Sequence, residues 1–204
     1  MKPLVVANWK MNPATLKGAK LLFNQVKNTG AVICPPFVYL SVLKTNGAQD
    51  LSWEDSGPYT GEVSALMLKN LGVEYVVVGH SERRKHLKET NEMIEKKLKA
   101  ALRAGLKPIL CIDKISQIPK DLDKEVIVAY EPLFAIGTGK PCSIVIAKKM
   151  RDLIKHPFVL YGGSVNAQNA KDYVCKAGFQ GLLVGGASLK PQEFIDIVKN
   201  VCYC

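Results

Sequence analysis

The sequence predicts an α/β fold, a closed (β/α)8 barrel, with residues 1–204 forming a single domain. Two observations favour this fold. Short apolar runs alternate eight times with segments of helical periodicity, and no linker, low-complexity tract or charge block divides the chain. An open doubly wound sheet is the alternative, but the sequence lacks the glycine-rich dinucleotide loop of that fold.

The predicted strands are short, rich in β-branched residues, and bounded by proline, glycine or polar residues. The third strand is weak, because its apolar run is brief and a long polar loop follows it. In order, the runs cover residues 3–7, 31–34, 47–51, 75–78, 109–112, 126–129, 158–161 and 181–184.

The predicted helices follow from apolar residues at helical spacing. The clearest spans residues 90–104, with Thr90 as its N-cap and Gly105 after its last turn. Thr60 is expected to cap another helix, which runs through Leu68. The remaining helices are expected over residues 15–30, 37–45, 143–155, 166–177 and 191–201.

The connection between the fifth and sixth strands is short. Residues 113–125 are close to the minimum of about 10–12 residues for a parallel crossover, and their apolar spacing is poor. We therefore expect at most one or two helical turns there, in a shortened barrel whose helix between strands 5 and 6 is reduced or missing. The length of 204 residues is also below the ~250 residues typical of such barrels.

The net charge of +10 raises the question of nucleic-acid binding. Basic and acidic residues alternate in helical stretches such as residues 85–99, so a solvated, lysine-rich surface is favoured and no nucleic-acid partner is expected. A positive field would also attract a small anionic substrate. No apolar run approaches the ~18 residues of a membrane span, and the N-terminal apolar stretch is too short for a signal peptide, so we expect no membrane association and a cytoplasmic location.

The six cysteines form no CxxC pair and show no metal-ligand spacing. Cys34 and Cys111 lie within apolar runs and are expected to be core thiols. Cys202 and Cys204 are at the end of the chain. They could bind a metal, but free thiols in a frayed tail are favoured.

Residues 127–140 contain the first candidate for chemistry. An apolar run ends in Glu131, Pro132 blocks continuation of the strand, and two glycines near the end supply the backbone freedom of a hinged lid over residues 132–140. A carboxylate at the carboxyl end of a strand, beside a loop that can close, suits proton abstraction in a dry pocket. A surface loop with a solvated glutamate is the alternative interpretation.

Polar residues also follow the first and fourth predicted strands, at the end of the barrel where chemistry is expected. Asn8 and Lys10 follow the first strand, and Lys10 is either an exposed lysine or a positive charge for a developing enediolate or a phosphate. His80 follows the fourth strand and precedes a predicted helical turn over residues 81–83. It is either a satisfied structural histidine or, because a helix N-terminus disfavours imidazolium, a neutral hydrogen-bond donor to a carbonyl.

Paired glycines follow the seventh and eighth strands. Residues 162–163 are glycines before Ser164, and Gly185 and Gly186 follow the eighth strand. Such pairs commonly form tight turns, but before a helix they leave backbone N–H groups free to bind an anion. Two pairs on adjacent strands, together with the backbone at Gly137, would surround a phosphate.

Six segments in the same order carry a family resemblance: Ala7-Asn8-Trp9-Lys10-Met11-Asn12, Gly79-His80-Ser81-Glu82-Arg83-Arg84, Ala129-Tyr130-Glu131-Pro132, Ala135-Ile136-Gly137-Thr138-Gly139-Lys140, Tyr161-Gly162-Gly163-Ser164-Val165 and Gly185-Gly186-Ala187-Ser188-Leu189. The chain resembles the triosephosphate isomerase family from Val6 to about Val198. Together these motifs are highly specific.

The resemblance implies a TIM barrel and an isomerase that interconverts dihydroxyacetone phosphate and glyceraldehyde 3-phosphate by proton transfer through an enediolate, in glycolysis and gluconeogenesis. It implies Glu131 as the base and neutral His80 as the group that polarises the carbonyl. Lys10 would stabilise negative charge, with Glu82 positioning it, and Asn8 would orient the substrate. These are the expected catalytic residues.

The resemblance also implies how substrate is held. Residues 132–140 would close over it, and no metal or organic cofactor is implied. The expected substrate-binding residues are Asn8, Lys10, Gly137, Ser164, Gly185 and Gly186.

A homodimer through the polar loop of residues 52–62 is implied as well. Thr60 would then reach the active site near Asn8 of the partner subunit, and Glu62 would pair with Arg83 across the interface.

The sequence departs from the family in and near the lid. Phe134 stands where tryptophan is common, and residues 112–114 stand where a glycine and a glutamate are usual. Because phenylalanine lacks the ring N–H that contacts this glutamate in the family, we expect the open lid to be latched less firmly.

A competing hypothesis is a catalytically weakened barrel that acts as a binding or structural protein. The intact set of Asn8, Lys10, His80 and Glu131 favours an active enzyme, because a protein without catalysis would be free to lose these residues.

Overall fold

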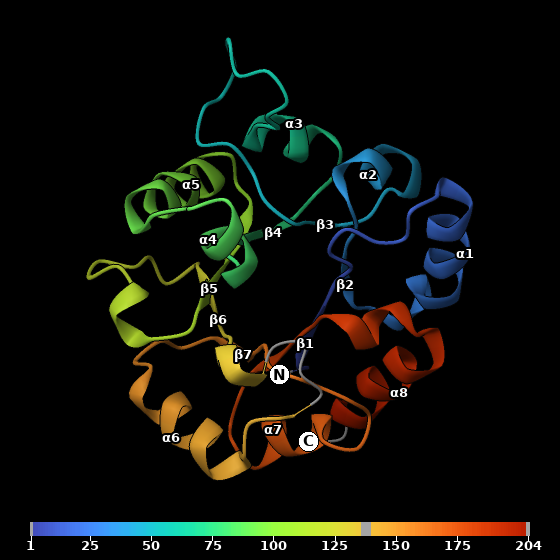
Figure 1. The fold of residues 1–204 in the computed structure, drawn as a ribbon, viewed down its shortest axis with the longest axis vertical. Helices are drawn as coiled ribbons and strands as arrows, with labels where there is room; N and C mark the ends of the chain where they lie inside the picture. The colour runs from blue at the N-terminus through green and yellow to red at the C-terminus, as the bar shows by residue number, and fades with distance from the viewer. Residues whose placement is uncertain (1, 136–139, 203–204) are drawn as a thin grey trace.

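The computed structural model describes residues 2–135 and 140–202. In it, eight parallel strands form a ring that is surrounded by helices (Figure 1). The predicted fold class is confirmed. The third strand is the shortest, as its weak sequence pattern predicts. The strands are β1 Leu4–Asn8, β2 Val32–Cys34, β3 Gly47–Ala48, β4 Tyr75–Val78, β5 Lys107–Ile112, β6 Ile127–Tyr130, β7 Val159–Tyr161 and β8 Gly181–Val184.

The helices alternate with the strands along the chain. The α-helices are α1 Leu16–Val26, α2 Phe37–Leu43, α3 Ala65–Asn70, α4 Ser81–His86, α5 Asn91–Arg103, α6 Ile144–Leu153, α7 Ala170–Cys175 and α8 Pro191–Val201. Single 3-10 turns are η1 Lys27–Thr29, η2 Ile115–Gln117, η3 Leu133–Ala135 and η4 Gly186–Leu189. Within the described part of the chain, none of these helices has the length and apolar character needed to cross a membrane.

The sheet runs in the order β2-β1-β8-β7-β6-β5-β4-β3, so β2 and β3 are its two ends. These ends meet in the ring (Figure 1), where Asn46 Oδ1 accepts a hydrogen bond from Ile33 N–H at 3.3 Å. Gly47 permits this approach, because a Cβ at its position would lie 2.5 Å from Cys34 Sγ. The short third strand therefore still closes the barrel.

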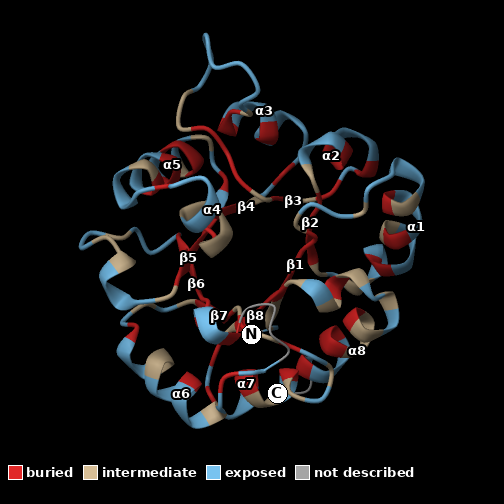
Figure 2. Ribbon diagram, in the orientation of Figure 1, coloured by how far each residue is buried: buried red, intermediate tan, exposed pale blue. Residues whose placement is uncertain are grey.

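Alternate residues of each strand face the barrel interior, as the pleat requires. Val6 of β1 and Val77 of β4 point inward, whereas Val5 and Val78 pack outward against the helices. Figure 2 shows the buried strands inside a ring of helices whose outer faces are exposed. The interior cluster comprises Val6, Val32, Cys34, Val77, Ile109, Cys111, Ile127, Ala129, Leu160 and Leu183, which confirms the prediction of two core thiols.

The crossover between β5 and β6 contains one helical turn, η2, as predicted. The turn stops at Ile118, which is extended (φ −82°, ψ 121°) because the following Pro119 disfavours a helical conformation at the preceding residue. Gln117 Oε1 accepts a hydrogen bond from Asp113 N–H at 2.8 Å and ties the start of the crossover to its turn.

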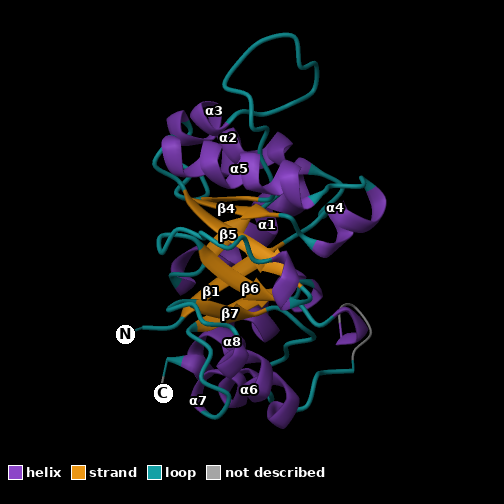
Figure 3. Cartoon of the chain, turned by 90° about the vertical axis from the view of Figure 1, so that its left-hand side faces the viewer, coloured by secondary structure: helices purple, strands orange, loops and turns teal. Residues whose placement is uncertain are grey.

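Two predicted helices begin later than expected. Thr60 caps no helix, because Gly61 adopts φ +93°, which a helix does not accommodate. Instead Ser64 caps α3, its Oγ accepting from Met67 N–H at 3.3 Å. The loop before it extends away from the barrel (Figure 3).

The helix expected over residues 166–177 is shortened to α7. The side-chain oxygens of Asn166 and Asn169 each accept a hydrogen bond from the other residue's N–H at 2.9 Å. This local turn competes with a first helical turn, and it delays the helix to Ala170.

A buried ionic cluster joins α5 to α4 and to the loop after β3. Lys97 Nζ lies 2.8 Å from Asp50 Oδ2 and 2.5 Å from Glu89 Oε1. Arg83 of α4 contacts the same carboxylates, at 2.8 Å and 2.7 Å respectively. The Lys97, Asp50 and Glu89 side chains are almost fully buried, so each charge depends on its partners in the cluster.

We predict that Lys97→Met lowers the free energy of unfolding by about 3–5 kcal/mol, because it leaves two buried carboxylates without their ammonium partner. Chemical denaturation measures this change. Lys99→Met is the control, since Lys99 is exposed on the same helix, and it should shift stability by less than about 0.5 kcal/mol. Equal effects of the two substitutions would contradict the prediction.

Candidate active site

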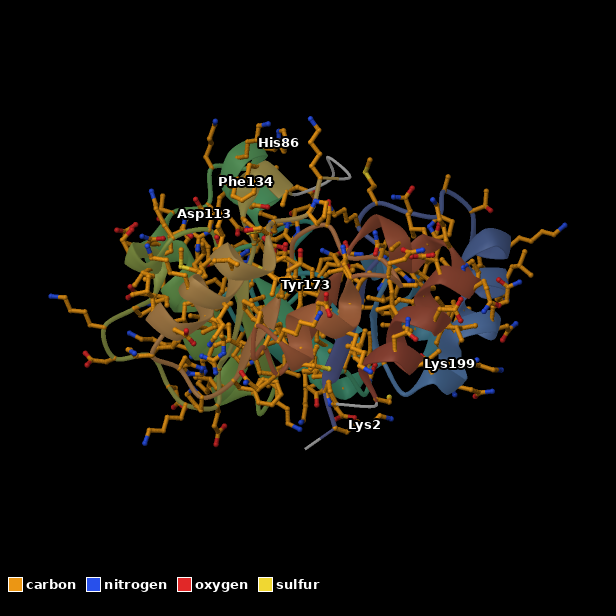
Figure 4. All side chains as sticks on the ribbon, turned by 90° about the horizontal axis from the view of Figure 1, so that it is seen from below. Lys2, His86, Asp113, Phe134, Tyr173 and Lys199 are labelled. Carbon is orange, nitrogen blue, oxygen red and sulfur yellow. The ribbon has the colours of Figure 1, made fainter. Side chains whose placement is uncertain are left out.

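A cavity of about 540 Å³ opens at the carboxyl ends of the strands. In Figure 4, Phe134 and His86, which follow β6 and β4, lie at one end of the molecule, and Lys2, which precedes β1, lies at the other. The predicted site residues among the described residues line this one cavity: Asn8, Lys10, His80, Glu131, Ser164, Gly185 and Gly186, with Gly162 and Gly163 beside them. The predicted Gly137 lies outside the described residues.

Glu131 faces the cavity because of the register of β6. Ile127 and Ala129 point into the barrel interior, and the two-residue period of a strand carries Glu131 to the same side, one step beyond the strand's end. Gly162 of the neighbouring strand leaves room for it, since a Cβ there would lie 2.9 Å from Glu131 Cγ. The carboxylate is 2% exposed, so it is a buried acid and the predicted alternative of a solvated glutamate is wrong.

His80 links the carboxylate to the first turn of α4. Its Nδ1 accepts a hydrogen bond from Glu82 N–H at 3.2 Å, which assigns the ring proton to Nε2. That nitrogen lies 3.0 Å from Glu131 Oε1. The neutral ring is therefore oriented to donate a hydrogen bond from Nε2 into the cavity.

The contact between the two groups changes the pKa of both. Burial alone lowers the pKa of His80, but the charge and hydrogen bond of Glu131 outweigh it and raise that pKa. Burial alone raises the pKa of Glu131, but His80 and the N–H of Ser81, which lies 3.3 Å from Glu131 Oε2, lower it below its usual value. The folding stability that the carboxylate contributes is thus present above the ordinary glutamate pKa and is lost as pH falls through the lowered pKa.

Lys10 supplies a positive charge to the cavity, which Lys190 also lines. Its Nζ lies 2.5 Å from Glu82 Oε1, on the same helical turn that holds His80. The backbone of Lys10 has a positive φ of 54°, and Gln49 Nε2 donates to its carbonyl oxygen at 2.8 Å. Lys10 N–H donates to Asn8 Oδ1 at 3.0 Å, so the two residues are held as one unit.

Gln49 is a supporting residue that sequence reasoning missed. Its amide also donates to Cys34 O at 2.8 Å and so connects the ends of β1 and β2. The only signal in the sequence was a polar amide inside the weak third apolar run, residues 47–51.

The glycines after β7 also make room for neighbouring side chains. A Cβ at Gly163 would lie 2.3 Å from Tyr161 Oη, so the residue there has to be glycine to make room for the phenol. Next in the chain, Ser164 Oγ donates to Ala135 O at 2.5 Å and ties the β7 end to the loop after Glu131.

A closed barrel whose cavity combines a buried carboxylate, an imidazole and an ammonium group defines a class of protein: an acid–base enzyme for a small anionic molecule. The sequence model of the triosephosphate isomerase family matches residues 3–201. The chain therefore belongs to the triosephosphate isomerase family.

Individual relatives agree with this assignment. The chain is 40% identical to triosephosphate isomerase of Alkaliphilus oremlandii, covering 97% of this chain and 99% of the relative. It is 38% identical to that of Dictyoglomus turgidum, with 98% and 99% covered. The crystal structure of triosephosphate isomerase from Bartonella henselae superimposes with a TM-score of 0.83 at 30% identity, covering 98% of this chain and 99% of that one.

The comparison also shows where this protein is shorter than its relatives. The alignment with the Alkaliphilus protein extends over 246 positions, whereas this chain has 204 residues. Since both chains are covered almost from end to end, the difference lies in internal segments that the relative has and this chain lacks.

We predict that His80→Leu raises the pKa of Glu131. Leucine keeps the site filled and apolar, while the hydrogen bond and the electrostatic effect of His80 that hold this pKa down are lost. Carbon-13 NMR of labelled glutamate side chains measures the titration directly. His86→Gln, an exposed position on the same helix, should leave the titration where it is, and an unchanged or lower pKa in His80→Leu would refute the prediction.

Proposed function

We propose that this protein interconverts dihydroxyacetone phosphate and glyceraldehyde 3-phosphate through an enediolate, in glycolysis and gluconeogenesis. The observation that carries the proposal is the buried pair of Glu131 and His80, 3.0 Å apart, in a cavity that Lys10 also lines. Membership of the family supports it.

The proton transfer follows from the groups present. Glu131 removes a proton from the carbon next to the carbonyl, and the electron pair of that C–H bond forms the carbon–carbon double bond of the enediolate. His80 donates from Nε2 to the oxygen on which negative charge develops, and Lys10 stabilises that charge. His80 then takes the proton of the neighbouring hydroxyl, and return of the proton from Glu131 to the adjacent carbon completes the isomerisation.

The substrate has to separate the two groups that touch in its absence. Glu131 then exchanges its contact with His80 for the substrate, while the N–H of Glu82 at Nδ1 still favours a neutral ring. The raised pKa of His80, which depends on the carboxylate, should therefore fall towards the value of a buried imidazole when substrate binds.

The phosphate would bind at the other side of the cavity. Ser164, Gly185 and Gly186 line it there, and we propose that their backbone N–H groups, with that of Gly137, hold the phosphate oxygens. Asn8 and Lys10 would contact the substrate from β1. This chemistry requires no metal or organic cofactor.

We predict that Glu131→Gln lowers kcat for isomerisation by about 10²–10⁴-fold, the contribution of a positioned general base, with a much smaller change in KM. A coupled assay on glyceraldehyde 3-phosphate measures both constants. Glu125→Gln is the control, because Glu125 is exposed in the β5–β6 crossover. An inactive wild-type protein would favour the alternative of a binding or structural barrel, and equal activity of wild type and Glu131→Gln would refute the assigned base.

The protein would act as a homodimer through the loop of residues 52–62. This loop extends away from the barrel (Figure 3), and Tyr59 within it is 45% exposed. The expected pairing of Glu62 with Arg83 across the interface stays a prediction, and it would add to the contacts that Arg83 makes with Asp50 and Glu89 of its own chain.

We predict that sedimentation equilibrium of the wild type gives about twice the 22.4 kDa chain mass, and that Tyr59→Asp shifts the protein to monomer by placing a charge in the interface. Val145→Asp puts the same charge on an exposed apolar position of α6 and should leave the dimer intact. A monomeric wild type would refute this assembly.

A further inference from the structure

Two tyrosines outside the cavity bind the backbone N–H and the backbone C=O of one residue, Cys142. Tyr161 Oη accepts a hydrogen bond from Cys142 N–H at 3.3 Å. Tyr173 Oη donates to Cys142 O at 2.6 Å. The first tyrosine ends β7 and the second lies in α7, so a residue that follows the predicted lid is fixed by the neighbouring β–α unit.

The two rings form a rigid support for these hydroxyls. They stack with centroids 3.7 Å apart and an interplanar angle of 12°, and Phe179 packs against Tyr161 edge-on at 5.4 Å. Both tyrosines are almost completely buried. Burial raises the pKa of both phenols, so each keeps its proton at neutral pH and Tyr173 remains a donor.

Cys142 is the point where the loop from Glu131 enters α6. It precedes Ser143, whose Oγ caps α6 by accepting from Ile146 N–H at 3.3 Å. On the other side of the loop, Ser164 Oγ donates to Ala135 O. Both anchors come from the β7–α7 unit, which also supplies Gly162 and Gly163 of the cavity.

Tyr173 lies outside the cavity. It is not among the residues that line the cavity, and in Figure 4 it lies between the end that carries Phe134 and the end that carries Lys2. Its ring packs in the core, but its hydroxyl is not needed for packing. The hydroxyl is therefore the part of Tyr173 available for a role in the loop.

We propose that Tyr173 is a positioning residue: its hydroxyl fixes the Cys142 carbonyl and so sets where the C-terminal end of the loop over the substrate is anchored. This inference rests on the proposed isomerase function and names a residue through which the loop protects the intermediate. Loss of the hydroxyl frees the Cys142 carbonyl and loosens the anchor, while the stacked ring stays in place.

A loosened anchor has a chemical consequence that can be measured. In an enediolate phosphate, the electron pair on oxygen can expel the phosphate with cleavage of its C–O bond, which gives inorganic phosphate and 2-hydroxypropenal. The latter tautomerises to methylglyoxal. A loop held over the substrate suppresses this elimination by keeping the phosphate in place and water out.

The test compares elimination with isomerisation in Tyr173→Phe. Glyceraldehyde 3-phosphate is supplied, and inorganic phosphate release and isomer formation are measured on the same sample. We expect the ratio of elimination to isomerisation to rise about fivefold, the factor that one neutral hydrogen bond represents. Partial unfolding would lower both rates equally and leave this ratio unchanged, so the ratio separates positioning from a merely structural role.

Tyr39→Phe is the matched control. Tyr39 is also a buried tyrosine whose hydroxyl donates to a backbone carbonyl, that of Pro13, at 2.9 Å, and its loss should leave the ratio unchanged. Tyr161→Phe removes the other bond to Cys142 and should raise the ratio as Tyr173→Phe does, which keeps the test decisive if one variant does not fold.

The outcomes distinguish the two proposals. A wild-type protein that isomerises, with the same ratio in the tyrosine variants, overturns the role of Tyr173 alone. A wild-type protein that does not isomerise overturns the proposed function.

Discussion

The contact between Glu131 and His80 is the interaction around which the cavity is built. A buried carboxylate is strongly unfavourable unless it is paired and hydrogen-bonded, and here the imidazole at 3.0 Å and the N–H of Ser81 satisfy it. The same turn of α4 positions the histidine through the N–H of Glu82 and holds Lys10 through the Glu82 carboxylate. The first turn of α4 therefore holds three side chains of the site close together: Glu131, His80 and Lys10.

Close approach of the backbone is the second constraint. Gly162 leaves space for Glu131, and Gly163 leaves space for the Tyr161 hydroxyl. A motif that indicates anion binding in the sequence is therefore also a packing requirement, since a side chain at either position would displace a neighbour. The β7–α7 connection consequently supports the base, the cavity and the loop after Glu131 together.

The short chain retains these contacts of the site, although its outer layer of helices is reduced. The β5–β6 crossover has a single helical turn, although relatives in the family align over more positions than this chain contains. The retained elements are the strands and their carboxyl ends, which supply the site residues. Helices on the outside of the barrel contribute burial, and a barrel can lose part of that layer without losing its site geometry.

Local pattern was enough to predict much of this protein. Periodicity identified the eight strands, and the position of Glu131 after β6 followed from the end of an apolar run. The short length and poor apolar spacing of residues 113–125 predicted the reduced crossover. Thr90 was correctly predicted as a cap because its hydroxyl acts on an N–H three residues away. The error at Thr60 has a local cause too, since the positive φ of Gly61 is not specified by helical spacing alone.

The sequence by itself therefore determined the elements, their order and the residue types at the strand ends, because these depend on neighbours within a few positions. Only the tertiary structure decided which distant groups meet. Tyr173 reaches Cys142 across 31 positions, Ser81 reaches Glu131 across 50, and Lys97 reaches Asp50 across 47. Such contacts depend on how the closed sheet turns and staggers its strands, and no short stretch of sequence contains that information.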